Sequence, residues 1–347
     1  MALMPNVQCL ITNHQSPKGF QMKAVIPVAG MGTRLRPHTH TVPKALLHVA
    51  GKPIIGHILD EVAALGIEDL VLVVGVMGDQ ILRYVNEAYR FRSVEIVEQE
   101  ERKGLGHAIG LTKKMVGGEP ILIIYGDTIF GGDLSDAISD SADGMIGVKQ
   151  VADPARFGVV ELEGNRITNL VEKPEQFVSD LAIVGVNYIQ NTPLLFECLD
   201  ELLTEKIRTQ GEYQITDAFR KMVEKGAALE VFFLEDWFDC GKPETLLATN
   251  RHLLEKQSAP FDIAGSTILP PVSIAPSAAI VGSIVGPYVS VAEGARVEWS
   301  IVKDSIIGEA AVVQHGLLEG SLVGNRAFVQ GALQRLNVGD SSEIRIG

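Results

Sequence analysis

The stretch KAVIPVAGMGTRLRP, residues 23–37, joins an aliphatic and β-branched run to a segment rich in glycine and arginine. The run predicts a buried strand over 23–30 that ends in a loop. Three further apolar runs follow, separated by stretches with helical spacing: 69–76, 94–99 and 120–127. Alternating strands and helices predict an α/β fold with a mostly parallel sheet. Ligands of such sheets bind beyond the carboxyl ends of the strands, which here are Gly30, Gln99 and Asp127.

From about Pro260 the sequence changes to an aliphatic repeat with a step of five or six residues. A six-residue repeat is typical of a parallel β-helix, in which each repeat forms one side of a triangular coil. Twelve such positions predict about four coils. The alternative is an aliphatic-rich β-sandwich, in which twelve aliphatic residues would have to follow this spacing by chance. The positions are Ile268, Ile274, Ile280, Val285, Val291, Val297, Val302, Ile307, Val313, Leu318, Val323 and Val329.

These two patterns divide the 347 residues into two domains, as the length alone suggests. We expect the α/β domain over 22–250, a linker over 251–265 and the β-helix over 266–347. Organised sequence begins at Met22, so we expect residues 1–21 to be a disordered extension or the product of a wrongly chosen start codon.

Charge and composition exclude several classes of binding partner and several locations in the cell. The chain has 30 basic and 43 acidic residues, a net charge of −13, which argues against binding to nucleic acid or to an anionic membrane. The sequence has no apolar run of the roughly 18 residues that a membrane span needs, and its N-terminus does not resemble a signal peptide. Its three cysteines, Cys9, Cys198 and Cys240, are too far apart for a zinc ribbon, and their odd number does not suggest a disulfide framework. We therefore expect a cytoplasmic protein.

The segment after the first strand has the character of a phosphate-binding loop. Gly30 and Gly32 allow the backbone to approach a phosphate closely. Leu35 stands where a dinucleotide-binding loop has its third glycine, and the lysine of a Walker loop is missing. Arg34 and Lys44 lie ten residues apart and suit the charge of a triphosphate, although two solvated surface cations are the alternative.

At this point the sequence resembles the sugar-1-phosphate nucleotidyltransferases, also called NDP-sugar pyrophosphorylases. The signature is AGMGTRLRPHTHTVPKALLHVAGKPII, residues 29–55. The resemblance implies a Rossmann-like nucleotidyltransferase domain followed by a left-handed parallel β-helix of hexapeptide repeats. Further matching stretches follow in the same order: EQEERKGLGHAI (98–109), YGDTIFGGDL (125–134), FGVVELEGNRITNLVEKP (157–174), GEYQITDAF (211–219) and WFDCGKPETLLATN (237–250).

The chemistry implied is attack by a sugar 1-phosphate on the α-phosphorus of a nucleoside triphosphate, with loss of pyrophosphate. A phosphate monoester has a second pKa of about 6, so this nucleophile needs no general base at pH 7. The resemblance makes Arg34 and Lys44 the catalytic residues, which hold the β- and γ-phosphates. It implies these nucleotide-binding residues: Ala29, Gly30, Gly32, Thr33, Gln99 and Gly104.

Particular residues are expected to recognise the base and to hold the metal. The amide of Gln99 offers a donor and an acceptor to the imide edge of uracil or thymine, unless it is merely an exposed residue at a strand end. Asp127 and Asp239 are implied to hold Mg²⁺ together with phosphate oxygens and waters, although Asp127 alone could cap a turn. Thr128 stands where many family members have Asn. The residues implied to bind the sugar phosphate are Gly158, Glu172 and Lys173.

Several alternatives stay open at this stage. Some motifs resemble UTP–glucose-1-phosphate uridylyltransferases, whereas the length and the β-helix resemble long-type glucose-1-phosphate thymidylyltransferases. We favour dTTP with glucose 1-phosphate, and one methyl group makes use of UTP plausible. A regulatory homologue without activity is disfavoured because Arg34, Lys44, Asp127 and Asp239 are all present. An acetyltransferase activity of the β-helix has only His315 to support it. The open sides of a β-helix suggest a homo-oligomer.

Overall fold

The computed structural model of this protein describes residues 22–131, 134, 137–139, 141–256 and 262–331. The expected extension over 1–21 lies outside the described residues, as do 257–261 of the expected linker and 332–347 of the expected β-helix.

A nine-stranded sheet forms the centre of the first domain, in the order β5-β4-β1-β6-β11-β8-β12-β10-β9. The strand β1 is the run that opens the fold, and β4 and β6 pair with it in parallel. The strands are β1 (Lys23–Pro27), β4 (Asp69–Val74), β5 (Ser93–Glu98), β6 (Ile121–Ile124), β8 (Gly144–Gln150), β9 (Gly158–Glu163), β10 (Arg166–Glu172), β11 (Leu181–Ile189) and β12 (Leu229–Phe233).

The sheet is parallel in the half that the N-terminal sequence predicts and mixed in the other half. The strands β5, β4, β1 and β6 are all parallel. Antiparallel pairing begins where β11 joins β6, and β9 and β10 form a hairpin. The hairpin turn is Gly164-Asn165, and Gly164 has a φ of +64°, which suits a tight turn between antiparallel strands. This direct connection makes β9 and β10 antiparallel, whereas β8 and β12 in the same half of the sheet are parallel.

Helices cover both faces of the sheet. Successive side chains of β1 point to opposite faces, and both kinds are apolar, so each face needs a cover. Ile26 belongs to a core beneath α1 and α2, and Val25 belongs to a second core beneath α3, α5 and α6. The helices are α1 (Ile54–Ala64), α2 (Gly78–Ala88), α3 (Leu105–Gly110), α4 (Lys113–Val116), α5 (Thr192–Glu205), α6 (Ile215–Glu224) and α7 (Pro243–Glu255).

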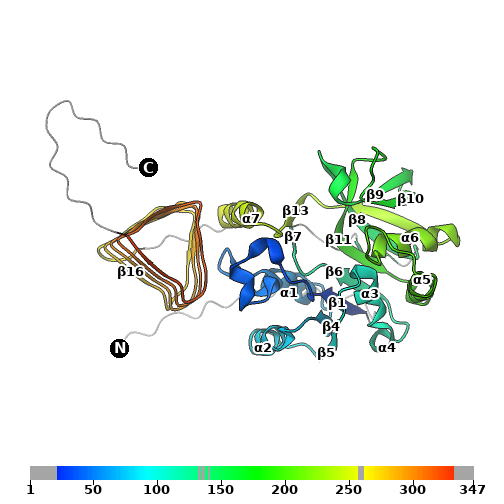
Figure 1. Ribbon diagram of the computed structural model, residues 1–347, viewed down its shortest axis with the longest axis horizontal. Helices are drawn as coiled ribbons and strands as arrows, with labels where there is room; N and C mark the ends of the chain where they lie inside the picture. The colour runs from blue at the N-terminus through cyan, green and yellow to red at the C-terminus, as the bar shows by residue number, and fades with distance from the viewer. Residues whose placement is uncertain (1–21, 132–133, 135–136, 140, 257–261, 332–347) are drawn as a thin grey trace.

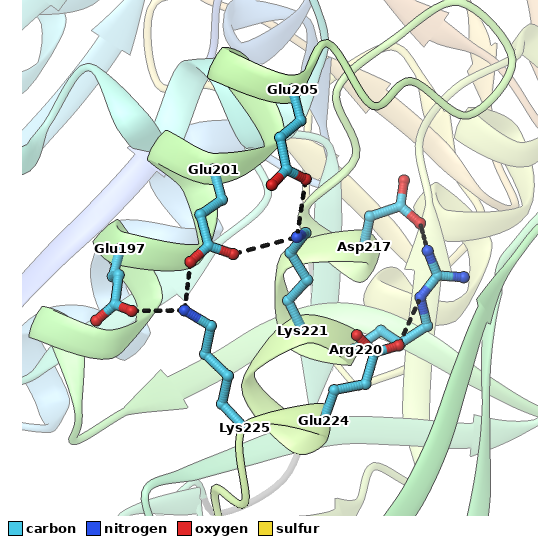
Figure 2. A network of polar contacts seen from close by, with 8 residues as sticks. All are labelled: Glu197, Glu201, Glu205, Asp217, Arg220, Lys221, Glu224 and Lys225. Atoms are coloured by element: carbon cyan, nitrogen blue, oxygen red, sulfur yellow. Dashed lines mark hydrogen bonds and ion pairs between the residues drawn. The ribbon is translucent and has the colours of Figure 1, made fainter.

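An ion-pair network joins α5 to α6 at the outer surface (Figure 2). Lys221 Nζ lies 3.1 Å from Glu201 and 3.2 Å from Glu205, and Lys225 Nζ lies 2.5 Å from Glu197 and also contacts Glu201. Hydrogen bonds from the two lysines hold the pKa of Glu201 below its ordinary value. The network is partly exposed, so we attribute the packing of the two helices mainly to the apolar core beneath them.

The C-terminal domain is a triangular β-helix (Figure 1). Over the described residues 262–331, twelve strands form three parallel four-stranded sheets, which make the four coils that the repeat predicts and fit a left-handed β-helix. Eight of the twelve predicted aliphatic positions belong to its buried apolar core, and Ile268, Ile274, Leu318 and Val329 pack against that core. The three sheets are β14 (Thr267–Ile268), β17 (Ile284–Val285), β20 (Ile301–Lys303) and β23 (Leu317–Glu319); β15 (Val272–Ile274), β18 (Val289–Val291), β21 (Ile306–Ile307) and β24 (Leu322–Val323); and β16 (Ala279–Val281), β19 (Arg296–Glu298), β22 (Val312–Gln314) and β25 (Phe328–Gln330).

The second of these sheets faces the first domain, and α7 lies between the two domains (Figure 1). Ile306 on the outer side of this sheet belongs to the same core as Ile26, and Leu322 packs against that core. The helix α7 continues to Glu255, so it includes the first five residues of the expected linker over 251–265. Among the described residues, no helix is both long enough and apolar enough to cross a membrane.

Burial in the β-helix predicts a difference between two valines of one sheet. Val297 is fully buried, whereas Val281 is 43% exposed. Val297→Ala removes buried methyl groups and leaves a cavity, so we expect a loss of about 2 kcal/mol in the free energy of unfolding. Val281→Ala is the matched control, with an expected change within about 0.5 kcal/mol. Thermal and urea unfolding measure both changes, and equal losses would contradict the inward orientation of Val297.

Candidate active site

Two short strands bring the predicted metal ligands together. The strands β7 (Thr128–Gly131) and β13 (Asp236–Asp239) pair antiparallel, so Asp239 lies opposite Thr128, directly after Asp127. The backbone N–H of Cys240 also donates to the carbonyl oxygen of Asp127 at 3.0 Å. The two aspartates, which lie 112 positions apart in the sequence, are therefore neighbours in the fold.

Both predicted catalytic cations lie beside these carboxylates. Lys44 Nζ donates to Asp127 Oδ2 at 2.5 Å, and the Lys44 side chain is only 11% exposed. A Cβ atom added at Gly241 would lie 2.7 Å from Asp239 Oδ1 and 2.9 Å from Arg34 Nη2. The absence of a side chain at Gly241 thus lets Asp239 and Arg34 approach each other. The four residues form one cluster of two cations and two carboxylates.

The cysteine in this cluster is a packing residue. Burial raises the pKa of the Cys240 thiol to about 12, and the charges of Asp127 and Asp239 act in the same direction. The Sγ atom donates to Thr249 Oγ1 at 3.7 Å. A thiol with so high a pKa is protonated at neutral pH, so it is a poor nucleophile.

The glycine-rich loop keeps the space beside β1 open. A Cβ atom at Gly30 would meet no atom within 4 Å, and Gly30 and Ala29 both line the cavity described below. Gly32 has a φ of +58°, and its carbonyl oxygen accepts a hydrogen bond from Thr39 Oγ1 at 2.8 Å. The 3₁₀ turn Thr33–Leu35 follows and carries Arg34.

A cavity of about 400 Å³ extends from the carboxylate cluster toward Gln99. Such a volume is sufficient for a nucleotide-sized ligand. Its walls come from the ends of β1 and β6 and from the segment after β5, as expected for a parallel sheet. The lining residues that the sequence singled out are Ala29, Gly30, Lys44, Gln99, Gly104 and Asp127.

Gln99 is largely buried and is held in place by its own amide group. Its Nε2 donates to the carbonyl oxygen of Gly104 at 3.0 Å and lies 3.1 Å from His107 Nδ1. Burial lowers the pKa of His107, so its ring is neutral at pH 7 and can accept this hydrogen bond. The two amide hydrogens are thus engaged within the protein. The carbonyl Oε1 of Gln99 is the group that remains for a base.

Gly104 is fixed by the segment GEYQITDAF, to which the sequence assigned no role. Gly104 has a φ of +108°, and a Cβ atom there would lie 2.5 Å from the carbonyl oxygen of Tyr213. The same oxygen accepts a hydrogen bond from Gly106 N at 2.8 Å, and Tyr213 N donates to Lys103 O at 2.7 Å. The backbone of Tyr213 therefore shapes the wall that carries Gly104.

The predicted acceptor residues form a second group at the β9–β10 hairpin. Glu172 lies opposite Gly158, and its Oε2 accepts a hydrogen bond from Thr216 Oγ1 at 2.7 Å. Lys173 has a φ of +45°, and its Nζ lies 3.5 Å from Glu172 Oε1. A Cβ atom at Gly158 would lie 2.9 Å from Glu172 Oε2, so the absence of a side chain at Gly158 lets the carboxylate approach the backbone. Thr216 is a site residue that the sequence analysis missed.

Tyr125 connects the acceptor group to the carboxylate cluster. It precedes Gly126 and Asp127 and lines the cavity. Burial raises the pKa of Tyr125 well above its ordinary value, and the negative charges of Glu172 and Asp127 raise it further. Gly185 has a φ of +83° and gives room for the ring. The phenol is thus neutral and lies within electrostatic reach of both groups.

The residues fit a divalent cation only with help from a substrate. Among the described residues, no group of three or more His, Cys, Asp or Glu side chains could hold a metal ion. Asp127 and Asp239 supply two hard oxygen ligands, and Mg²⁺ prefers six. Phosphate oxygens and waters would complete such a site, so the donor set suits a metal that arrives with a nucleotide.

The chain belongs to the nucleotidyl transferase family, whose family model matches residues 23–256. This result confirms the family that the sequence resembles. A solved structure of UDP-glucose pyrophosphorylase complexed with UDP-glucose superposes with a TM-score of 0.59 and 27% identity, over 68% of this chain and 99% of that one. Almost the whole of that protein is therefore matched by about two thirds of this chain.

Three curated relatives have similar levels of identity. The bifunctional protein GlmU of Methanococcus vannielii is 34% identical over 241 residues, which cover 67% of this chain and 55% of the relative. The glucose-1-phosphate thymidylyltransferase of Streptomyces antibioticus is 35% identical over 242 residues, with 67% of each covered. The UTP–glucose-1-phosphate uridylyltransferase AglF of Haloferax volcanii is 34% identical over 243 residues, with 68% and 98% covered. The chain thus spans about half the length of the first of these relatives.

The narrow space at Gly241 gives a test of the carboxylate cluster. Gly241→Ala places a methyl group against the ends of two flexible side chains, so we expect Asp239 and Arg34 to move while the fold persists. Metal-dependent binding of a nucleoside triphosphate should weaken by about tenfold or more. Gly110→Ala is the control, because its added Cβ would lie 3.8 Å from Leu203 Cδ1, an ordinary contact. Calorimetry and thermal melts on both variants distinguish a local effect from unfolding, and unchanged binding by Gly241→Ala would refute the cluster.

Proposed function

We propose that this protein transfers a nucleotidyl group from a nucleoside triphosphate to a sugar 1-phosphate and releases pyrophosphate, with Mg²⁺ as cofactor. The observation that carries the proposal is the cluster of Arg34, Lys44, Asp127 and Asp239, of which Lys44 and Asp127 line a nucleotide-sized cavity. Membership of the nucleotidyl transferase family supports it. The same cluster makes a homologue without activity the poorer explanation.

The reaction needs positioning and charge more than proton transfer. An oxygen of the sugar phosphate forms a bond to the α-phosphorus, and the bond from that phosphorus to the β-phosphate oxygen breaks. Arg34 and Lys44 supply positive charge to the departing pyrophosphate. Asp127 and Asp239 would hold Mg²⁺, which neutralises phosphate charge when it is bound. The nucleophile is already largely dianionic at pH 7, so no side chain is assigned as its base.

The acceptor is held by the group at the β9–β10 hairpin. Lys173 would pair with the phosphate of the sugar, and the Gly158 backbone would lie against the ring. Glu172 would accept hydrogen bonds from sugar hydroxyls through Oε1, because its Oε2 already accepts one from Thr216. We favour glucose 1-phosphate as the acceptor. Names of relatives that act on glucose 1-phosphate support this choice.

The base would be recognised by Gln99 through Oε1, which can accept the N3–H of a pyrimidine imide. Thymine and uracil both carry this group and differ by one methyl, which is worth only about 1–3 kcal/mol in a pocket. We favour dTTP, with UTP as the alternative. Because the donors are nucleoside triphosphates, we place the protein in the cytoplasm.

A pyrophosphate-release assay over a matrix of sugar 1-phosphates and nucleoside triphosphates tests this function. We expect the highest turnover with dTTP or UTP and glucose 1-phosphate. Asp127→Asn and Asp239→Asn keep the shape of each side chain but remove its charge, so each should abolish Mg²⁺-dependent turnover while the protein still unfolds cooperatively. Near wild-type kcat in either variant would show that the metal assignment is wrong.

We further propose that the protein is a homo-oligomer joined through the β-helix. On the first of its three sheets, Ile284, Ile301 and Leu317 are in register, and they are 38%, 46% and 80% exposed. This row, the apolar ladder, runs across three coils. At its edge Lys303 and Glu319 are 2.7 Å apart, so a second copy related by a twofold axis could meet each with the opposite charge. A second copy is therefore the occupant we assign to the ladder.

A single charge in the apolar ladder should separate the subunits. Ile301→Glu places a carboxylate at its centre, so we expect light scattering to give the mass of one chain, 37.4 kDa. Val281→Glu is the matched control, since Val281 is similarly exposed, at 43%, but lies on another sheet. It should leave the mass of the assembly unchanged. A monomeric wild type, or an assembly that survives Ile301→Glu, would contradict the assignment.

A further inference from the structure

One buried amide joins the two domains and the helix between them. Asn250 of α7 is fully buried, and its Oδ1 accepts a hydrogen bond from Ala50 N at 2.9 Å. The same oxygen accepts from Ser290 Oγ of the β-helix at 2.6 Å, and Nδ2 donates to the carbonyl oxygen of Tyr288 at 3.1 Å. A single side chain therefore contacts the first domain on one side and the β-helix on the other.

The contact in the first domain is the tip of a hairpin. The strands β2 (His48–Val49) and β3 (Lys52–Pro53) pair antiparallel, and Ala50 and Gly51 form the turn between them. Ala50 has a φ of +45°, which is unfavourable for a residue with a side chain and needs support from its surroundings. The hydrogen bond to Asn250 provides that support.

The β-helix also touches this tip directly. Gly51 has a φ of +96°, and a Cβ atom there would lie 2.5 Å from Ser273 Oγ of β15. The turn thus lies directly against the sheet that faces the first domain. A displacement of this sheet would move the hairpin with it.

The hairpin leads back to the carboxylate cluster within a few residues. The 3₁₀ turn Lys44–Leu46 precedes β2, and Leu47 N donates to the carbonyl oxygen of Lys44 at 3.0 Å. Ile54 N donates to Leu47 O at 3.0 Å and closes the base of the hairpin. Lys44 Nζ reaches Asp127 from this short, hydrogen-bonded segment.

We propose that Asn250 is a positioning residue that couples the β-helix to Lys44 through the Ala50–Gly51 turn. This inference rests on the proposed function, in which Lys44 binds phosphate. The amide is suited to the task because it supplies two acceptor sites and a donor at one buried point. An apolar side chain of similar size would remove both the hydrogen bond from the Ala50 N–H and the hydrogen bond to the Tyr288 carbonyl oxygen.

The neighbouring residue provides a matched control. Arg251 pairs with Asp304 of the β-helix through Nε and Nη2, and Asp304 is only 5% exposed. This pair also joins α7 to the β-helix, but Arg251 directs both of these hydrogen bonds to Asp304 and not to the hairpin. Arg251→Met should therefore lower the melting temperature without altering Lys44, whereas Asn250→Leu should alter both.

The first experiment is a double-mutant cycle in the full chain. If Asn250 acts through Lys44, Asn250→Leu should lower kcat/KM for the nucleoside triphosphate by about tenfold in the wild-type background. In the Lys44→Ala background it should have less than about a twofold effect. Arg251→Met should change kcat/KM by less than about twofold in either background. Equal effects of Asn250→Leu in both backgrounds would overturn the proposal.

A second measurement does not need activity. Hydrogen exchange at the Leu46 and Leu47 amides should become faster in Asn250→Leu and stay unchanged in Arg251→Met. Equal exchange in the two variants would reduce Asn250 to a purely stabilising residue and overturn the coupling. A wild type that releases no pyrophosphate would refute the proposed function, while this exchange difference would still decide the coupling.

If Asn250→Leu does not fold, Asn250→Asp replaces it. The new carboxyl keeps an acceptor for Ala50 N, and only its protonated form can donate to the Tyr288 carbonyl oxygen. Burial raises the pKa of such a carboxyl in the folded state, so its support is present at low pH and lost as pH rises through that pKa. We expect kcat/KM relative to wild type to rise as pH falls from 8 to 6. If the ratio does not rise and hydrogen exchange at the Leu46 and Leu47 amides also matches wild type, the coupling is contradicted.

The histidines near the hairpin do not titrate in the pH range of this experiment. Burial lowers the pKa of His48 and of His57 to about 4. Both rings are therefore neutral throughout the range from pH 6 to pH 8. Wild type measured over the same range corrects for titration of the substrates.

Discussion

The ion pair between Lys44 and Asp127 is the contact around which the site is organised. It joins the segment that follows β1 to the end of β6, and these strands are parallel neighbours. Parallel pairing places both carboxyl ends at one edge of the sheet, so the loop after β1 and the aspartate after β6 have to meet there. The β7–β13 pair then brings Asp239 to the same place. The cavity and its chemistry follow from this one meeting point.

The local sequence was sufficient to predict one half of the site. Gly30, Gln99 and Asp127 end aliphatic runs that predict parallel strands, so their convergence at one edge of the sheet could be expected, and all three line the cavity. Arg34 and Lys44 were assigned by the family resemblance. The six-residue repeat was equally informative, because each of its aliphatic residues points inward in a coil of fixed geometry. In the β-helix one residue period dictates one face, and the core lies on that face.

The remaining parts depend on contacts between distant segments. The antiparallel pairings of β11 and the β9–β10 hairpin have no short-range signal that distinguishes them from parallel strands. Thr216 orients Glu172 from a helix 44 residues away, and Tyr213 shapes the wall at Gly104 through backbone atoms alone. A backbone contact leaves no trace in side-chain chemistry. The sequence analysis identified the glycines Gly104 and Gly158, but it could not identify Tyr213 and Thr216, the residues that lie against them.

The β-helix connects to the site through one of its three sides. Its second sheet packs against the first domain, where Ser290 and Ser273 meet Asn250 and Gly51. The apolar ladder lies on another side of the same triangle. Each coil is hydrogen-bonded to the next along all three sheets, so the triangle behaves as a stiff body. A force on one side of the triangle would therefore reach the segment that carries Lys44 as a rigid displacement of the other side against the Ala50–Gly51 turn.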